Sequence, residues 1–352
     1  MKLLITGGAG FIGSNFAHLI CQERPDWEIT ILDALTYTSN LKSLETIRHK
    51  IRFVEGSVTD QTLVDELVAA CNSVVHFAAE VHVDKSLQSP GVFVDTNIVG
   101  MYTVLEAVRR HQKRLHHVST DEVFGSLTSQ DTVKFTEDTK YAPSNPYSAT
   151  KASQDMLVRA YVRSFGVQAT LSNCTNNYGP YSHVEKYIPH TITNILHGGQ
   201  PIVFGEGASV RDWIHVEDHC RAVLAILERG RLGETYMVSA GVESSVLQTA
   251  QLLLELMGRS PEDYKRVPDR PNDDVRYAAD ASKLKRELGW EPKFSDFRAG
   301  LANTIEWYQQ HRDWWEHTKE KDNERLRNII LERTEATAPT IDPPAGAPTV
   351  QA

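Results

Sequence analysis

The chain has 352 residues and a formal net charge of −9, a length sufficient for a large buried core and typically for two lobes. The acidic excess is scattered and no basic stripe runs along the chain, which argues against a nucleic-acid-binding protein. No apolar run is expected to approach the roughly 20 residues of a membrane helix. No signal peptide precedes the first apolar stretch, so a cytoplasmic protein is expected.

Apolar stretches predict strands at 3–6, 28–33, 51–55, 73–77 and 115–119, and between them helices near 14–24, 62–70 and 94–111. A long helix at 144–165 and a strand at 168–174 follow. Alternation of this kind predicts an α/β fold, a doubly wound parallel sheet of the Rossmann type. The four cysteines show no paired spacing typical of a metal site, so reduced, structural cysteines and no metal are expected.

Beyond about residue 180 the pattern loosens, and glycine- and proline-rich loops interrupt it. We expect residues 1–178 to form the main domain, to which a later segment near 212–240 returns. Residues 179–330 are expected to form mainly a smaller C-terminal substrate lobe. The Ala/Pro/Thr-rich residues 335–352 have almost no bulky apolar side chains and are predicted to be a disordered tail.

A glycine-rich loop, Gly7-Gly8-Ala9-Gly10-Phe11-Ile12-Gly13, joins the first strand to the first helix. Glycines at 7, 10 and 13 permit a tight turn, the approach of a pyrophosphate and close helix–strand packing. Asp33 lies at the end of the second predicted strand, twenty positions after Gly13. Its carboxylate can bind both ribose hydroxyls and would repel a 2′-phosphate, so the cofactor is predicted to be NAD. Alternatively, Asp33 only caps a turn.

Two further motifs carry acid–base chemistry. Tyr147 and Lys151 lie four residues apart in a predicted helix, so they share one face, where an ammonium favours the phenolate. A tyrosine base near neutrality needs its pKa lowered by roughly three units, about 4 kcal/mol. Thr120-Asp121-Glu122 follows an apolar strand and adds two adjacent carboxyls. Alternatively, the tyrosine only packs, the lysine is solvated and the acids cap the strand end.

With the Tyr–Lys pair, this glycine spacing resembles the extended short-chain dehydrogenase/reductase family. The resemblance narrows to its dTDP-glucose 4,6-dehydratases, from the first residue to about residue 320. It rests on Thr120-Asp121-Glu122, the segment Asn173-Cys174-Thr175-Asn176-Asn177-Tyr178-Gly179-Pro180-Tyr181, Glu185-Lys186-Tyr187-Ile188-Pro189 and Val210-Arg211-Asp212-Trp213.

The resemblance implies a substrate, a product and a role for each catalytic residue. The substrate is a nucleotide-linked glucose, and the product is its 4-keto-6-deoxy derivative. Tyr147, ionised beside Lys151 and the positive nicotinamide, takes the proton from the 4-hydroxyl. Glu122 removes the C5 proton, Asp121 protonates the departing 6-hydroxyl, and Thr120 hydrogen-bonds near O4. NAD is regenerated in each turnover, and no metal takes part.

The resemblance also implies the binding residues. Those expected to contact NAD are Gly7, Gly10, Phe11, Ile12, Gly13, Asp33, Leu35, Thr36, Ser57, Val58, Phe77, Ala78, Ala79, Thr96, Tyr147, Lys151 and Asn173. Asn97 is an alternative to Thr96. Those expected to contact the nucleotide sugar are His82, Thr120, Asn176, Glu185, Lys186, Arg211, Arg270 and Asp273. A homodimer is expected through two long helices, with apolar stripes at Met101, Leu105 and Val108 and at Met156, Leu157 and Tyr161.

The chain departs from the family pattern at its nucleotide end. Ser57 replaces an aspartate that contacts adenine, so NAD is expected to bind less tightly or through Asp60. Asn272-Asp273 replaces a Gly-His pair that faces the substrate's nucleotide, and an asparagine is missing near Ser245-Val246. Three alternatives therefore stay open: a 4,6-dehydratase of another nucleotide sugar, a nucleotide-sugar 4-epimerase or reductase, and a non-enzymatic NAD-dependent sensor or binding subunit.

Overall fold

A parallel sheet organises the first half of the protein. The computed structural model describes residues 1–128, 132–269 and 274–319. Seven strands lie in the order β10-β6-β5-β4-β1-β2-β3, and every pairing between them is parallel. Their bounds are β1 Lys2–Thr6, β2 Glu28–Asp33, β3 Ile51–Glu55, β4 Ser73–His76, β5 Arg114–Thr120, β6 Ala169–Cys174 and β10 Thr235–Val238. The predicted doubly wound parallel sheet is confirmed.

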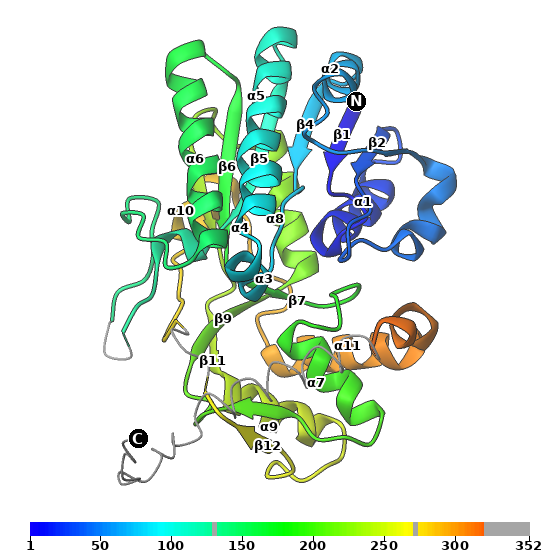
Figure 1. Cartoon of the computed structure of the whole chain (residues 1–352), viewed down its shortest axis with the longest axis vertical. Coiled ribbons are helices and arrows are strands. Elements are labelled where there is room, and N and C mark those ends of the chain that lie inside the picture. Colours follow the sequence, from blue (N-terminus) through cyan, green and yellow to red (C-terminus); the bar gives the residue numbers. More distant parts are fainter. Residues whose placement is uncertain (129–131, 270–273, 320–352) are drawn as a thin grey trace, which may run out of the picture.

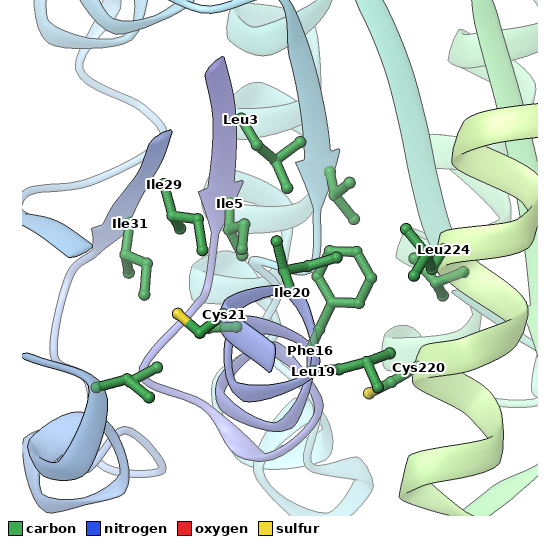
Figure 2. Close-up of a cluster of buried hydrophobic side chains, with 14 of the residues drawn as sticks. Leu3, Ile5, Phe16, Leu19, Ile20, Cys21, Ile29, Ile31, Cys220 and Leu224 are labelled. Atoms are coloured by element: carbon green, nitrogen blue, oxygen red, sulfur yellow. The ribbon is translucent and has the colours of Figure 1, made fainter. Parts of the chain in front are cut away.

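Helices cover both faces of this sheet (Figure 1). On one face, α1 (Phe11–Glu23) packs against α8 (Val216–Arg229). Figure 2 shows Phe16, Leu19 and Ile20 of α1 between the first strands and Leu224 of α8. On the other face lie α2 (Gln61–Ala70), α5 (Gly100–His111) and α6 (Pro146–Phe165). Two 3₁₀ segments, Leu41–Lys50 and Asp121–Phe124, follow β2 and β5.

A continuous run of helix, Pro90–His111, precedes β5. It consists of α4 (Pro90–Phe93), a π-helical segment (Val94–Val99) and α5, and it follows α3 (Val83–Gln88). By length and composition this run could cross a membrane, so the expectation that no segment approaches that length was wrong. Half of its apolar window is buried inside the folded protein, as in a core helix of the sheet domain.

The C-terminal half adds two small sheets at the carboxyl end of the main strands (Figure 1). In one, β9 (Val210–His215) pairs with β7 (Asn176–Tyr178) and β11 (Val242–Ser245); in the other, β8 (Ile202–Phe204) pairs with β12 (Lys265–Val267). Around them lie α7 (Tyr187–Leu196), α9 (Val246–Leu256), α10 (Ser282–Leu288) and α11 (Phe297–Gln310). An aromatic cluster that includes Tyr178, Trp213 and Trp315 packs α7 and α11 together. The predicted tail, 335–352, lies outside the described residues.

Candidate functional site

The glycine loop brings the backbone of α1 close to β1 and β4. A Cβ on Gly13 would lie 2.2 Å from the Gly7 carbonyl oxygen, and a Cβ on Gly7 would lie 2.7 Å from the Ala78 backbone nitrogen. Gly7 has a φ of +71°, a region that favours glycine. Gly10 caps α1 without a side-chain acceptor, so the first N–H groups of the helix remain available for a phosphate.

The Asp33 carboxylate closes this loop from the end of β2. Its Oδ2 accepts from the Ala9 N–H at 2.8 Å, and its Oδ1 accepts from the Leu35 N–H and the Ser39 hydroxyl, each at 2.8 Å. Asp33 therefore does cap a turn, and it also braces the glycine loop. A carboxylate has about four acceptor positions, so it still has capacity for a ribose hydroxyl.

A cavity of about 410 Å³ lies at the carboxyl edge of the main sheet, where open α/β folds bind their ligands. All five predicted catalytic residues line it: Thr120, Asp121, Glu122, Tyr147 and Lys151. So do most of the predicted cofactor residues: Gly7, Gly10, Phe11, Ile12, Gly13, Asp33, Thr36, Ser57, Val58, Phe77, Ala78, Ala79 and Thr96. Predicted residues from seven separate segments of the chain therefore meet in one place.

Three residues suggested for the cofactor do not line this cavity. Leu35 has a φ of +51° and donates its N–H to Asp33. Asn173 is fully buried, and its amide donates to the Thr120 carbonyl oxygen at 3.0 Å. Asn97 is also fully buried; it accepts from the Glu80 N–H and donates to Thr150. We interpret all three as braces beneath the cavity.

Ser57 and Asp60, the two residues considered for contact with the adenine of NAD, lie in different places. Ser57 lines the cavity, but its hydroxyl is 2.8 Å from that of Thr59. Asp60 accepts from the Leu63 N–H as the N-cap of α2 and does not line the cavity. A cofactor contact through Asp60 therefore has no support in the geometry.

Asp121 and Glu122 begin the 3₁₀ turn after β5, with Thr120 as its N-cap. The Thr120 hydroxyl donates to Asp121 Oδ1 at 3.3 Å and accepts from the Glu122 N–H at 3.3 Å. Asp121 is almost fully buried, and its Oδ2 has no hydrogen-bond partner among the described residues. Burial, with the nearby Glu122 and Asp212 charges, raises the pKa of Asp121 well above its ordinary value. The protonated form of Asp121 is therefore favoured relative to an exposed aspartate.

Tyr147 and Lys151 lie on the first turns of α6. The helix begins with Pro146 and a reciprocal capping box between Asn145 and Ser148, which fixes where both side chains point. Both residues are buried, and the Lys151 ammonium donates to the Val118 carbonyl oxygen at 3.0 Å. The phenol and the ammonium therefore reach the cavity from one helix face.

The pKa values of this pair differ from the prediction. Burial, followed by the Glu122 charge, raises the pKa of Tyr147 well above its ordinary value. Burial also lowers the pKa of Lys151 to about 8, against the charge of Asp155. The Lys151 ammonium is therefore not sufficient to bring the pKa of Tyr147 below its ordinary value, and a further positive charge in the cavity would favour the phenolate.

The predicted substrate residues divide into two groups. Asn176 and Lys186 line the cavity; the Asn176 Oδ1 is buried and has no hydrogen-bond partner within the described ranges. His82 and Glu185 lie behind this wall, with His82 Nε2 and Glu185 Oε1 3.7 Å apart. Arg211 also does not line the cavity.

Arg211 donates to the Asp274 carbonyl oxygen at 2.9 Å and lies 4.8 Å from the Tyr277 ring centre. The charge of Arg211 is near enough to oppose the rise in the pKa of Asp121. Arg270 and Asp273, the other predicted substrate contacts, lie outside the described residues.

A buried polar network behind Lys151 was missed in the sequence. Asp155, one turn further along α6, contacts His117 of β5 and Tyr141 of the preceding loop. The spacing of four residues after Lys151 was the available signal, because it repeats the spacing between Tyr147 and Lys151. The cavity lining also includes Thr38, Ser39, Glu80, Thr175, Asn177 and His183, which were not among the predicted site residues.

Comparison with known proteins agrees with the motifs. Residues 4–304 match the family described as GDP-mannose 4,6 dehydratase. A dTDP-glucose 4,6-dehydratase of Mycobacterium tuberculosis is 55% identical over 327 residues, covering 93% of this chain and 99% of that protein. The crystal structure of DesIV, a dTDP-glucose 4,6-dehydratase from Streptomyces venezuelae with NAD and TYD bound, has a TM-score of 0.86 and 42% identity, covering 90% of this chain and 99% of the other. A UDP-glucose 4-epimerase of Thermotoga maritima is also similar, with a TM-score of 0.82 but 28% identity, covering 88% and 99%.

Proposed function

The chain belongs to the GDP-mannose 4,6 dehydratase family, within the extended short-chain dehydrogenases/reductases, and from this membership we propose that it is a dTDP-glucose 4,6-dehydratase. It converts dTDP-glucose into dTDP-4-keto-6-deoxyglucose. The observation that carries the proposal is the buried Asp121, with its pKa raised by burial, beside Glu122 and in one cavity with Tyr147 and Lys151. An epimerase needs no acid to expel a 6-hydroxyl, so this carboxyl pair favours a dehydratase.

NAD fits the glycine cradle, which a side chain at position 7 or 13 would fill. The N–H groups at the start of α1 and the carboxylate of Asp33 would hold its pyrophosphate and adenosine ribose. When bound, NAD accepts a hydride from C4 of the sugar and returns it at C6. Its positive nicotinamide also supplies the charge that the phenolate of Tyr147 requires.

The protein side chains move the protons. Tyr147 takes the proton of the 4-hydroxyl, and the Thr120 hydroxyl donates a hydrogen bond to O4. The ketone at C4 acidifies the C5 proton, which Glu122 removes. Asp121 donates its proton to the 6-hydroxyl, so that water leaves. Two adjacent carboxyls in a buried site separate their titrations, and this separation keeps one acid protonated while the other acts as a base.

The proposed division of labour follows the fold. Residues 1–178, with the segment near 212–240, hold NAD and the reacting groups, and residues 179–330 form mainly the nucleotide-sugar lobe. We propose that Lys186 and Arg211 bind the substrate diphosphate, because charge-assisted hydrogen bonds to phosphate are strong. The departures at Asn272-Asp273 leave a 4,6-dehydratase of another nucleotide sugar as the second candidate.

We also propose a cytoplasmic homodimer. The apolar stripe on α5 does not support the dimer, because Met101, Leu105 and Val108 are buried in the core of their own subunit. Other large apolar side chains on these helices are exposed: Leu87, Val94, Val99, Tyr102 and Met156. The segments that carry them, α3 to α6, pack against one another, which supports a helix-to-helix contact with a second copy. The four cysteines are buried and unpaired, which supports a reducing compartment.

The test is incubation of the purified protein with dTDP-glucose and detection of the alkali-induced absorbance of a 4-keto-6-deoxy sugar. UDP-, CDP- and GDP-glucose are run in parallel. Keto product from dTDP-glucose alone is the expected result. Keto product from another nucleotide sugar would favour the second candidate, and an epimer without keto product would overturn the dehydratase. Sedimentation of wild type and Tyr102→Glu tests the dimer, which the added charge should dissociate.

A further inference from the structure

We propose that Asp155 is a positioning residue for this reaction: it is the buried counter-charge of Lys151 and, through Asn173, an anchor for Thr120. The inference rests on the proposed function, because it concerns the same site. Asp155 itself does not line the cavity, so it acts through the two residues that do.

Asp155 is fully buried on the inner face of α6. Three donors surround its carboxylate: His117 Nε2 at 3.1 Å, the Tyr141 hydroxyl at 2.9 Å and Asn173 Nδ2 at 3.0 Å. They come from β5, from the loop before α6 and from β6. A carboxylate held by several donors is stabilised in its ionised form, and the pKa of Asp155 is indeed lowered despite burial.

None of the three donors brings a full positive charge near neutral pH. Burial lowers the pKa of His117 to about 4, so its ring is neutral and its Nε2–H donates to Asp155. Tyr141 and Asn173 are neutral as well. The cation that balances this buried carboxylate is therefore Lys151, one helical turn earlier on the same face of α6.

The negative charge of Asp155 helps to keep Lys151 protonated. Burial lowers the pKa of Lys151 to about 8, and the charge of Asp155 is the largest influence that opposes this fall. Without the carboxylate charge, the pKa would fall further and part of the ammonium would be lost near neutral pH. A neutral amine would no longer favour the phenolate of Tyr147.

Asp155 is also connected to Thr120 by hydrogen bonds through Asn173. Asn173 Nδ2 donates both to Asp155 Oδ2 and to the Thr120 carbonyl oxygen, each at 3.0 Å. Thr120 in turn donates its hydroxyl to Asp121. The carboxylate is thus linked through one amide to the turn that carries the proposed acid.

Other titratable groups lie around this pair. The His76 ring is 5.7 Å from the His117 ring and is held neutral by burial, which lowers its pKa. The Arg159 guanidinium lies 5.1 Å from the Tyr141 ring centre and donates to the Thr235 hydroxyl. Cys174 has its pKa raised to about 12 by burial and stays neutral. These groups are unchanged in all the variants compared below, so a difference between the variants does not come from them.

The test is the titration of Tyr147 in NAD-loaded protein, followed as tyrosinate absorbance in the near ultraviolet, with Tyr147→Phe as the baseline to subtract. Asp155→Asn keeps the shape of the side chain and removes its charge. We expect its Tyr147 midpoint to rise by about one pH unit, which lowers kcat about tenfold near neutral pH with little change in KM. Tyr141→Phe removes one donor but keeps the charge, and should move the midpoint far less.

This titration needs no sugar nucleotide, so it stands even if the protein acts on another substrate. An unchanged midpoint in folded, NAD-loaded Asp155→Asn would overturn the proposal. Should that variant not fold, the pair is tested in the Lys151→Met background, where the buried carboxylate lacks its counter-charge. There Asp155→Asn should raise Tm, and a decrease would overturn the proposal.

Discussion

The carboxyl edge of the main sheet and the C-terminal lobe are built in different ways. At the sheet edge, three short motifs bring a glycine cradle, a carboxyl pair and a Tyr–Lys pair into one cavity. In the lobe, Lys186 lines that cavity, whereas Glu185 and Arg211 lie behind it. The comparison suggests that the chemistry is set locally by the sheet, while nucleotide recognition depends on loops from distant parts of the chain. Variants can test this separation.

The largest effect is expected from Gly13→Ala at the sheet edge. The new methyl would lie 2.2 Å from the Gly7 carbonyl oxygen, so the cradle has to open. We expect NAD to be lost and activity to fall to background, measured by the dinucleotide content of purified protein. Gly91→Ala is the matched control, because nothing lies within 4 Å of its added methyl. Normal NAD content in Gly13→Ala would show that the cradle is not needed.

Glu122→Gln should stop the reaction after the first oxidation. General acid–base groups typically contribute about 10²- to 10⁴-fold, so kcat should fall within that range. Enzyme-bound NADH should accumulate and be visible by its absorbance after one turnover. Glu228→Gln, which removes an exposed partner of Arg24, is the control. Full turnover without Glu122 would exclude it as the C5 base.

Arg211→Gln tests the lobe. Loss of a charge-assisted hydrogen bond costs about 1.5–3 kcal/mol, so KM for the nucleotide sugar should rise roughly 10- to 100-fold while kcat changes little. Arg221→Gln is the control, since that arginine pairs with Glu23 on the surface. A fall in kcat with an unchanged KM would break the separation between chemistry and recognition.

A smaller effect is expected from His215→Asn on acid stability. His215 caps α8, and burial lowers its pKa to about 4, below the ordinary value of 6.5. The unfolded chain therefore binds one more proton between pH 6.5 and 4, and stability is lost as pH falls through that window. Asn keeps the cap but does not titrate, so the slope should decrease by about 1.4 kcal/mol per pH unit, measured by denaturant unfolding.

The sequence predicted the sheet well because each of its early strands is a short apolar run followed by a turn signal. The helix at 144–165 was predicted to follow Pro143, and in the structure it begins at Pro146 with Asn145 as its cap. The cavity followed from motifs that lie at strand ends, where parallel strands share an edge.

The rest depended on contacts between distant residues. The helices α8 and α9 were passed over, although α8 is strongly amphipathic, because glycine-rich loops around them suggested irregular structure. The face that α5 turns to solvent could not be read from its apolar residues, since Met101 packs against α2 and the sheet. The burial of Tyr147, which raises its pKa, could not be read from the spacing of the Tyr–Lys pair.

One feature at the adenosine end has a consequence for cofactor choice. Asp33 is held by two backbone N–H groups and a serine hydroxyl. A carboxylate held in this position would repel the 2′-phosphate of a phosphorylated ribose. The cell's ratio of phosphorylated to unphosphorylated dinucleotide should then matter little, because discrimination is fixed when the polypeptide folds.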